Sequence, residues 1–188
     1  MRIGVSGPHG TGKTTLVGEL CAQLPGHVPA DEPYVLLEEA GYDVGFPPSL
    51  EDYRAQLQQS MRMLSSSGAS VVFDRTPVDF LAYLAAQGAD LEDEADPAAL
   101  RSALARLDLL VLTPVTAETE RVLPRAEMPQ LRQAVNDTLL DLVYRDPLHA
   151  WAGVPVTELD GPLDQRPAAV LAALPWHARR QAGSPGVP

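Results

Sequence analysis

Residues 7–14 read Gly-Pro-His-Gly-Thr-Gly-Lys-Thr and match the phosphate-binding pattern G-x-x-x-x-G-K-[ST]. Glycines adopt backbone angles that are forbidden to other residues, so successive N–H groups of this loop can turn inward around a phosphate. Lys13, the only lysine of the chain, adds a point charge that reaches the β- and γ-phosphates. The Thr14 hydroxyl can bind Mg²⁺. The segment therefore predicts a site for ATP and its magnesium ion.

The residues expected to contact the nucleotide are Gly7, His9, Gly10, Thr11, Gly12, Lys13, Thr14 and Thr15. Thr15 or the backbone can hold the α-phosphate. His9 occupies a position of the pattern that tolerates any residue, so we interpret its side chain as an incidental loop histidine that takes no part in catalysis.

The elements around the loop occur in the order that such a site requires. Residues 2–6 are apolar enough for a buried strand. Leucines 16, 20 and 24 then lie four apart on one face of a helix that ends at Pro25-Gly26. The loop is thus expected to join a strand to a helix N-terminus, where anions bind.

Further strands alternate with helices along the rest of the chain. We expect strands at 27–30, 70–73, 109–112 and 154–159, and helices that begin near residues 49, 76, 96, 130 and 168. Pro155 places the last strand at an edge of the sheet. The acidic stretch 90–96 is interpreted as a solvated loop, with a metal site as the weaker alternative. The pattern predicts an α/β protein with the three-layer P-loop NTPase fold and a five-stranded parallel sheet.

Polar residues follow two more strands at the rim that carries the phosphate loop. Asp31 and Glu32 follow the second strand, and Asp74 and Arg75 end the third. An aspartate at the end of an apolar strand beside a phosphate loop occupies the Walker B position, where it binds Mg²⁺ or a water of its shell. Arg75 is a fixed cation that can neutralise a transferring phosphoryl group, but it cannot accept a proton from water. This favours phosphotransfer over hydrolysis.

These residues resemble those of the P-loop kinases of small molecules, in particular the deoxynucleoside kinase and thymidylate kinase group and related small proteins often labelled AAA-type ATPases. Asp31-Glu32-Pro33 and Asp74-Arg75-Thr76 are similar to the two polar motifs of that group. The resemblance implies that Glu32, or alternatively Asp31, acts as general base for an acceptor hydroxyl. It also implies that Asp74 holds the Mg²⁺ shell and that Arg75 contacts phosphate or substrate.

The same resemblance implies a helical lid around residues 114–130 that brings arginines over the phosphates. Arg121, Arg125 and Arg132 are the candidates, and Arg125 is our choice because the segment around Pro124 is the least regular. A salt-bridged surface is the alternative, since glutamates lie among these arginines. Asp160 and Gly161 would border the adenine.

The acceptor pocket is the part on which the sequence says least. Aromatic side chains stack on bases and rings and could line it. The candidates are Tyr34, Tyr42, Phe46, Tyr53, Phe80 and Tyr83, although most of them suit a core equally well.

The composition limits the number of domains and the kinds of partner and bond that the protein can have. Its 188 residues, 45% of them hydrophobic, suit a single domain over 1–178, followed by a tail at 179–188 expected to be disordered. A net charge of −11 argues against a nucleic-acid partner. The single cysteine excludes an internal disulfide. Without a signal peptide or a membrane-spanning apolar run, the protein is expected to be cytoplasmic. A homodimer is compatible with the sequence.

Three functions fit these observations. The first is an ATP- and Mg²⁺-dependent phosphotransferase that acts on a small-molecule acceptor, such as a nucleoside, a nucleotide or a related metabolite. The second is a regulatory switch that binds or hydrolyses ATP. The third is a polynucleotide 5′-end kinase. The sequence disfavours a regulatory GTPase, because the guanine motif of such proteins needs a lysine besides Lys13.

Overall fold

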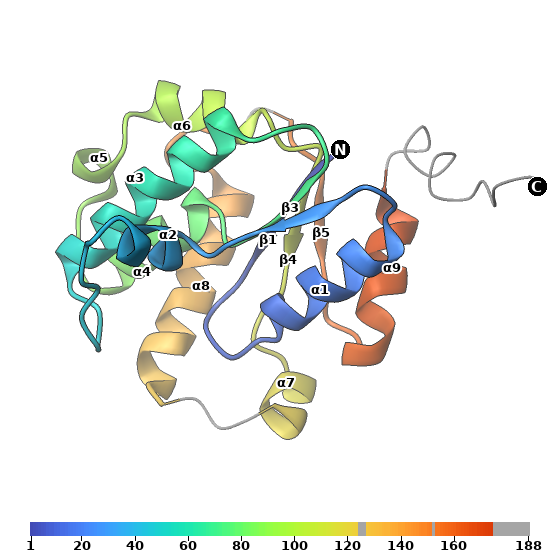
Figure 1. Cartoon of the computed structure of the whole chain (residues 1–188). Coiled ribbons are helices and arrows are strands. Elements are labelled where there is room, and N and C mark those ends of the chain that lie inside the picture. Colours follow the sequence, from blue (N-terminus) through green and yellow to red (C-terminus); the bar gives the residue numbers. More distant parts are fainter. Residues whose placement is uncertain (124–126, 152, 175–188) are drawn as a thin grey trace, which may run out of the picture.

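A computed structural model describes residues 1–123, 127–151 and 153–174. Its centre is a parallel sheet in the order β2-β3-β1-β4-β5 (Figure 1). The strands are β1 (Arg2–Ser6), β2 (Val28–Ala30), β3 (Val71–Asp74), β4 (Leu109–Leu112) and β5 (Val156–Glu158). β1, β3 and β4 are fully buried runs, as expected of strands covered on both faces. The predicted α/β fold with a five-stranded parallel sheet is confirmed, and β5 lies at an edge.

Helices cover both faces of the sheet and complete three layers (Figure 1). One face packs against α1 and α9, and the other packs against α3, α4, α6 and α8. The helices are α1 (Lys13–Gln23), α2 (Pro33–Glu39), α3 (Leu50–Ser66), α4 (Pro77–Ala86), α5 (Leu91–Glu94), α6 (Pro97–Leu104), α7 (Ala117–Val122), α8 (Pro129–Arg145), the 3-10 turn η1 (Leu163–Gln165) and α9 (Arg166–Ala173).

Capping residues fix the N-termini of α3 and α4, the two helices that contribute side chains to the site. In α3, the Ser49 hydroxyl accepts from the Asp52 N–H while the Asp52 carboxylate accepts from the Ser49 N–H. Thr76 and Asp79 form the same reciprocal cap at the start of α4. Such caps satisfy N–H groups that the first helical turn leaves without partners. They fix where each helix begins, and therefore how its side chains meet the strand ends.

Two segments differ from the sequence-based expectation. Residues after Glu32 form α2, which begins with Pro33 at its first position. The acidic stretch contains α5 and is tied to α3, because Glu94 receives three hydrogen bonds from Arg54, the shortest of 2.6 Å, and the Glu94 side chain is only 6% exposed. Asp90 caps α5 through its side chain. The acidic residues therefore serve a local helix, and the described residues hold no metal-binding cluster there.

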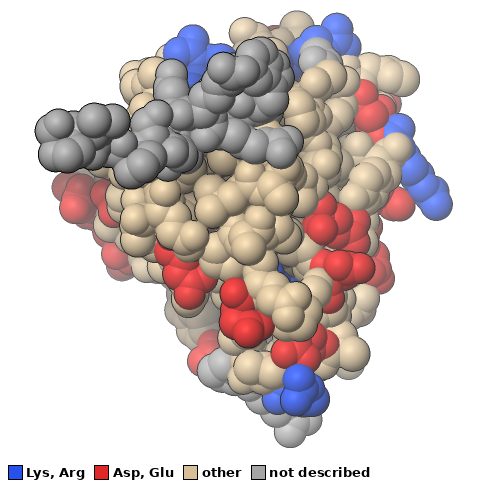
Figure 2. Space-filling view, turned by 90° about the vertical axis from the view of Figure 1, so that its right-hand side faces the viewer, with Lys and Arg blue, Asp and Glu red and all other residues tan. Residues whose placement is uncertain are grey.

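The surface reflects the acidic composition. On the side of the molecule that carries α1 and α9, acidic side chains spread over the lower half of the visible face and basic ones lie mainly at its edges (Figure 2). Among the described helices, none combines the length and the apolar character needed to cross a membrane.

Candidate nucleotide and acceptor site

The phosphate loop lies between β1 and α1, as predicted. Gly10 and Gly12 have φ angles of 67° and 82°, in the left-handed region that favours glycine. Gly7 is needed for a different reason, since a Cβ there would lie 2.2 Å from the Thr113 side-chain oxygen. Gly10 and Gly12 are thus required by the backbone conformation, and Gly7 is required by the close approach of Thr113.

Side chains from four other elements hold the loop. Asp79 of α4 accepts a hydrogen bond of 2.8 Å from the Gly7 N–H. Arg132 of α8 donates to the main-chain oxygens of residues 9 and 10, at 3.0 and 3.2 Å. Arg166 of α9 donates to the Thr11 carbonyl at 2.8 Å. The Thr11 hydroxyl pairs with that of Thr113, after β4, at 2.9 Å. The loop is therefore held in place by contacts within the protein.

Lys13 is buried beneath this loop, and its Nζ donates to the Pro8 carbonyl at 2.7 Å. Burial, reinforced by the nearby Arg75 cation, lowers the pKa of Lys13 to about 7. The carboxylates of Asp79, Asp74 and Glu32 oppose this shift. A triphosphate in the loop would favour the charged amine, which is the role predicted for it.

Asp74 ends β3 with a buried carboxylate whose oxygens make no hydrogen bond of normal geometry among the described residues, and Thr14 supplies the one side-chain hydrogen-bonding group that acts on it. Burial raises the pKa of Asp74, and the neighbouring Glu32 adds to the effect. Thr14, Lys13 and Arg75 counteract it in part. A buried carboxylate without a partner is costly unless a cation joins it. Hard oxygen ligands of this kind suit Mg²⁺, so Asp74 and Thr14 fit the predicted ion.

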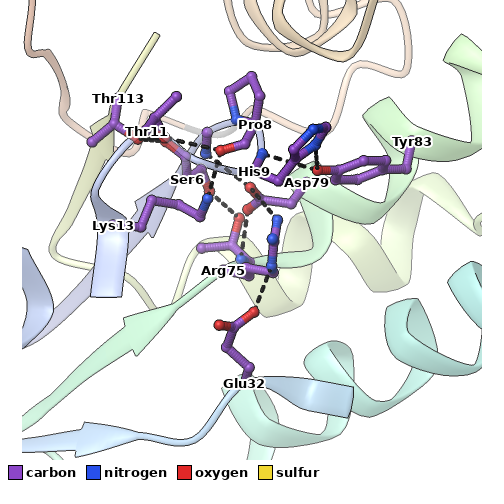
Figure 3. A network of polar contacts seen from close by, with 12 residues as sticks. Ser6, Pro8, His9, Thr11, Lys13, Glu32, Arg75, Asp79, Tyr83 and Thr113 are labelled. Atoms are coloured by element: carbon purple, nitrogen blue, oxygen red, sulfur yellow. Dashed lines mark hydrogen bonds and ion pairs between the residues drawn. The ribbon is translucent and has the colours of Figure 1, made fainter. Parts of the chain in front are cut away.

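Arg75 and Glu32 form an ion pair at the rim, with 2.8 Å between Arg75 Nε and Glu32 Oε2 (Figure 3). The Arg75 guanidinium also lies over the Tyr83 ring, 5.6 Å from its centroid, and 3.9 Å from Asp79. Burial acts to lower the pKa of Arg75, but Tyr83, Glu32 and Asp79 outweigh it and raise the pKa overall. Arg75 has a φ of 75°, a strained value for a non-glycine residue that is typical of functional sites.

Two cavities meet at this ion pair. One of about 300 Å³ is lined by the phosphate loop, including Lys13 and Thr14. The other, of about 450 Å³, extends beneath α2 and the segment before α3. The residues that line both cavities are His9, Glu32 and Arg75. Asp31 is exposed and lines neither cavity, so the geometry favours Glu32 as the candidate base.

The larger cavity has aromatic walls. Five of the six aromatic candidates line it, namely Tyr34, Phe46, Tyr53, Phe80 and Tyr83. Tyr53 and Tyr83 are stacked, with ring centroids 4.7 Å apart. Tyr42 is the exception, because its hydroxyl donates to Asp52 at 3.1 Å and its ring does not line the cavity. The aromatic set therefore belongs to the site and the core together.

His9 is more constrained than the incidental loop histidine that the sequence suggested. Its N–H donates to the Tyr83 hydroxyl at 3.0 Å, and its ring Nδ1 lies 3.1 Å from the same oxygen (Figure 3). Burial, together with the Arg75, Lys13 and Arg132 cations, lowers the pKa of His9 to about 4. No motif marks this position; only the tertiary contact with Tyr83 reveals it.

The arginines assigned to a lid have different surroundings. Arg132 is buried and binds the loop carbonyls, while Arg121 is 73% exposed and pairs with Glu118 on α7. Arg125 lies outside the described residues, as does the tail 179–188. Arg132 is therefore a support of the loop. Sequence reasoning missed Arg166 altogether, since nothing local links it to Thr11.

Asp160 and Gly161 follow β5, and neither lines the two cavities. The same connection approaches the phosphate loop, because a Cβ at Gly12 would lie 3.9 Å from the Leu163 side chain. A role for Asp160 and Gly161 beside the adenine stays a prediction.

Solved structures with the same fold include two kinds of nucleotide-binding protein. Deoxyadenosine kinase from M. mycoides with bound dATP matches with a TM-score of 0.61 at 15% identity, over 92% of this chain and 97% of that chain. NadR protein in complex with NR matches with a TM-score of 0.61 at 23% identity, over 92% of this chain and 51% of that chain. At such identities the likeness establishes the fold.

NadR protein in complex with NAD and AMP-PNP matches with a TM-score of 0.64 at 21% identity, over 100% of this chain and 51% of that chain. The chain thus spans about half the length of NadR. A search of curated proteins finds no match. A family model described as an AAA domain matches residues 2–166. The chain therefore belongs to this AAA domain family, and its fold is that of the P-loop nucleoside and nucleotide kinases.

Proposed function

We propose that the protein is an ATP- and Mg²⁺-dependent phosphotransferase that moves the γ-phosphoryl group of ATP to a hydroxyl of a small acceptor. The observation that carries the proposal is the junction of two cavities at Glu32 and Arg75. A hydrolase needs only a path for water, whereas this site has a second cavity of about 450 Å³ beside the phosphate loop. That volume suits a small organic molecule.

In this proposal, the two shared residues have complementary roles. Glu32 accepts the proton of the acceptor hydroxyl, and Arg75 neutralises charge that spreads over the transferring phosphoryl oxygens. Their ion pair holds both side chains at the boundary where transfer would occur. Lys13 binds the β- and γ-phosphates. Mg²⁺, when bound near Asp74 and Thr14, would supply further charge neutralisation.

The charges of the larger cavity favour a nucleoside-like acceptor over a nucleotide. Glu32, Glu38 and Glu127 line it, and Arg75 is its one arginine or lysine among the described residues. Arg75 is already paired with Glu32, so an acceptor phosphate would meet a surplus of negative charge. The ligands named for the similar structures, which include dATP, NR, NAD and AMP-PNP, support a site for nucleotides and related compounds, whereas the preference for a nucleoside-like acceptor rests on the charges of this cavity.

The test is ADP formation with and without candidate acceptors, namely nucleosides, nucleoside monophosphates, sugars and 5′-hydroxyl oligonucleotides. We expect ADP release to rise with at least one nucleoside, with one phosphorylated product formed per ADP. A slow rate that is the same with every acceptor would instead indicate a regulatory protein that hydrolyses ATP. Product formed only from oligonucleotides would indicate a 5′-end kinase.

The variant Glu32→Gln tests the proposed base. It keeps the shape of the side chain but cannot take up the proton, so transfer should fall about 10²- to 10⁴-fold while ATP still binds. The matched control is Asp31→Asn, at the exposed neighbouring carboxylate, which should retain transfer. Normal transfer by Glu32→Gln, or its loss in Asp31→Asn alone, would exclude Glu32 as the base.

A further inference from the structure

His9 has a hydrogen-bonding capacity that none of the described residues satisfies. Its backbone N–H donates to the Tyr83 oxygen, and its carbonyl accepts from Arg132. Its ring Nδ1 lies 3.1 Å from the Tyr83 oxygen. Its ring Nε2 is buried and has no hydrogen-bond partner among the described residues. The residue is thus fixed on one side and unsatisfied on the other.

The contacts of Tyr83 decide which ring nitrogen carries the proton. The Tyr83 oxygen accepts from the His9 N–H, and its own proton has no other acceptor than Nδ1 among the described contacts. Donation from Tyr83 to Nδ1 satisfies both groups and leaves the imidazole proton on Nε2. The opposite tautomer would leave the buried tyrosine hydroxyl without an acceptor. The arrangement therefore assigns a neutral ring with Nε2–H as the free donor.

Tyr83 is itself held rigidly, and it therefore fixes the orientation of the His9 ring. It is 4% exposed and stacks on Tyr53 with an interplanar angle of 10°. The Arg75 guanidinium lies over its ring. His9 cannot easily turn away, because main-chain contacts to Tyr83 and Arg132 hold its backbone as well. The free donor is consequently preorganised, which is the property that makes a hydrogen bond effective in a transition state.

The location of His9 indicates its ligand. It lines both cavities, together with Glu32 and Arg75, and so lies where the nucleotide compartment ends and the acceptor compartment begins. In the proposed reaction this boundary receives the γ-phosphoryl group. Its oxygens are strong acceptors, whereas the acceptor hydroxyl is directed to the Glu32 carboxylate.

We infer that His9 is a catalytic residue whose Nε2–H donates a hydrogen bond to a γ-phosphoryl oxygen of bound ATP. The donor distinguishes a triphosphate from a diphosphate and stabilises the phosphoryl group during its transfer. Tyr83 acts through His9 as a positioning residue, because it fixes the tautomer and the orientation of the ring. The inference rests on the proposed nucleotide site, but it does not depend on the identity of the acceptor.

Two substitutions at His9 separate the donor from the rest of the side chain. An asparagine amide reaches about as far as Nδ1, so His9→Asn keeps the link to Tyr83 and loses the distal donor. A glutamine amide reaches about as far as Nε2, so His9→Gln restores that donor. Tyr83→Phe removes the hydroxyl and leaves the stacked ring in place. Affinities for ADP and for AMP-PNP, measured by calorimetry with Mg²⁺, report the bond without any turnover.

We expect His9→Asn to bind ADP as the unchanged protein does and to bind AMP-PNP about tenfold more weakly, as befits one hydrogen bond to a charged group. His9→Gln should recover most of the AMP-PNP affinity, and Tyr83→Phe should lie between the two. Equal ratios of AMP-PNP to ADP affinity in all four proteins would overturn the role of His9 even if ATP is the substrate. Failure of the unchanged protein to bind either nucleotide would overturn the proposed function and this inference with it.

Discussion

The walls of the two cavities are built in different ways. The phosphate cavity is lined largely by residues of the phosphate loop, whose backbone Asp79, Arg132 and Arg166 hold in place from three separate helices. The acceptor cavity is formed by side chains, and part of its wall is the segment 44–48 before α3, where Phe46 is 78% exposed. The contrast separates two tasks. In the proposed reaction, the held loop would bind ATP whatever the acceptor is, and the side chains of the larger cavity would select the acceptor.

The largest expected effect comes from the phosphate side. Lys13→Ala removes the only cation that the phosphate loop itself supplies, so phosphotransfer should fall about a thousandfold or more. The acceptor cavity should be unaffected, because Lys13 does not line it. A lysine-directed ATP analogue should label Lys13 in the unchanged protein and, apart from the N-terminal amine, nothing else. Transfer that survives in Lys13→Ala would contradict the assignment of this cavity to ATP.

Two buried aspartates on the phosphate side should respond in opposite ways. Asp79 accepts from two N–H groups, whereas the Asp74 oxygens accept no N–H among the described residues and only the Thr14 side chain acts on them as a hydrogen-bonding group. The pKa of Asp74 is raised in the folded protein, so its charged form lowers the free energy of unfolding above that pKa, and this penalty disappears as the pH falls. Asp74→Asn should therefore lower transfer about a hundredfold and raise the free energy of unfolding at pH 7 by about 1 kcal/mol.

The matched variant Asp79→Asn should lower the free energy of unfolding, because it weakens both the cap of α4 and the contact with Gly7. Chemical denaturation without nucleotide measures both effects. A loss of stability in Asp74→Asn would mean that its carboxylate has a partner in solution and is not available for Mg²⁺.

Nucleotide binding should depend on pH through Lys13. The pKa of this amine is about 7 in the protein alone, and a bound triphosphate would raise it. Binding at pH 8 therefore takes up a proton, and affinity should fall by up to about tenfold per pH unit above 7. Calorimetry at pH 8 in two buffers with different ionisation enthalpies measures the uptake. Lys13→Arg is the control, since its guanidinium stays charged. Identical heats in both buffers for the unchanged protein would exclude this coupling.

The sequence predicts the phosphate side well because its determinants are local. Residues 7–14 occupy consecutive positions, and the leucines of α1 repeat at helical spacing. Asp74 and Arg75 were recognised because they end an apolar strand beside that loop. The capping pair Thr76 and Asp79 was also predictable, although one oxygen of Asp79 does more than cap a helix: it accepts from the Gly7 N–H across the site.

The remaining features depend on contacts between distant parts of the chain. Arg166 lies 155 positions from Thr11, whose carbonyl it binds, and no spacing rule links such residues. Arg132 carries the charge expected of a lid residue, but its donors point to loop carbonyls. His9 occupies a position that the motif leaves free. The proline at the first position of α2 was a usable signal for that helix.

The smallest expected effect tests the acceptor side. Phe46→Ala removes an aromatic face from the larger cavity, so KM for the acceptor should rise roughly threefold to tenfold. KM for ATP should not change, because Phe46 does not line the phosphate cavity. Thermal stability should change little, since the ring is mostly exposed. Tyr144→Ala is the control: that residue is 58% exposed and lines neither cavity, so both KM values should be retained.

A rise in KM for ATP in Phe46→Ala would mean that the two compartments are not separate. An unchanged KM for the acceptor would mean that acceptor binding depends on the buried stack of Tyr53 and Tyr83 and that the exposed rim contributes nothing.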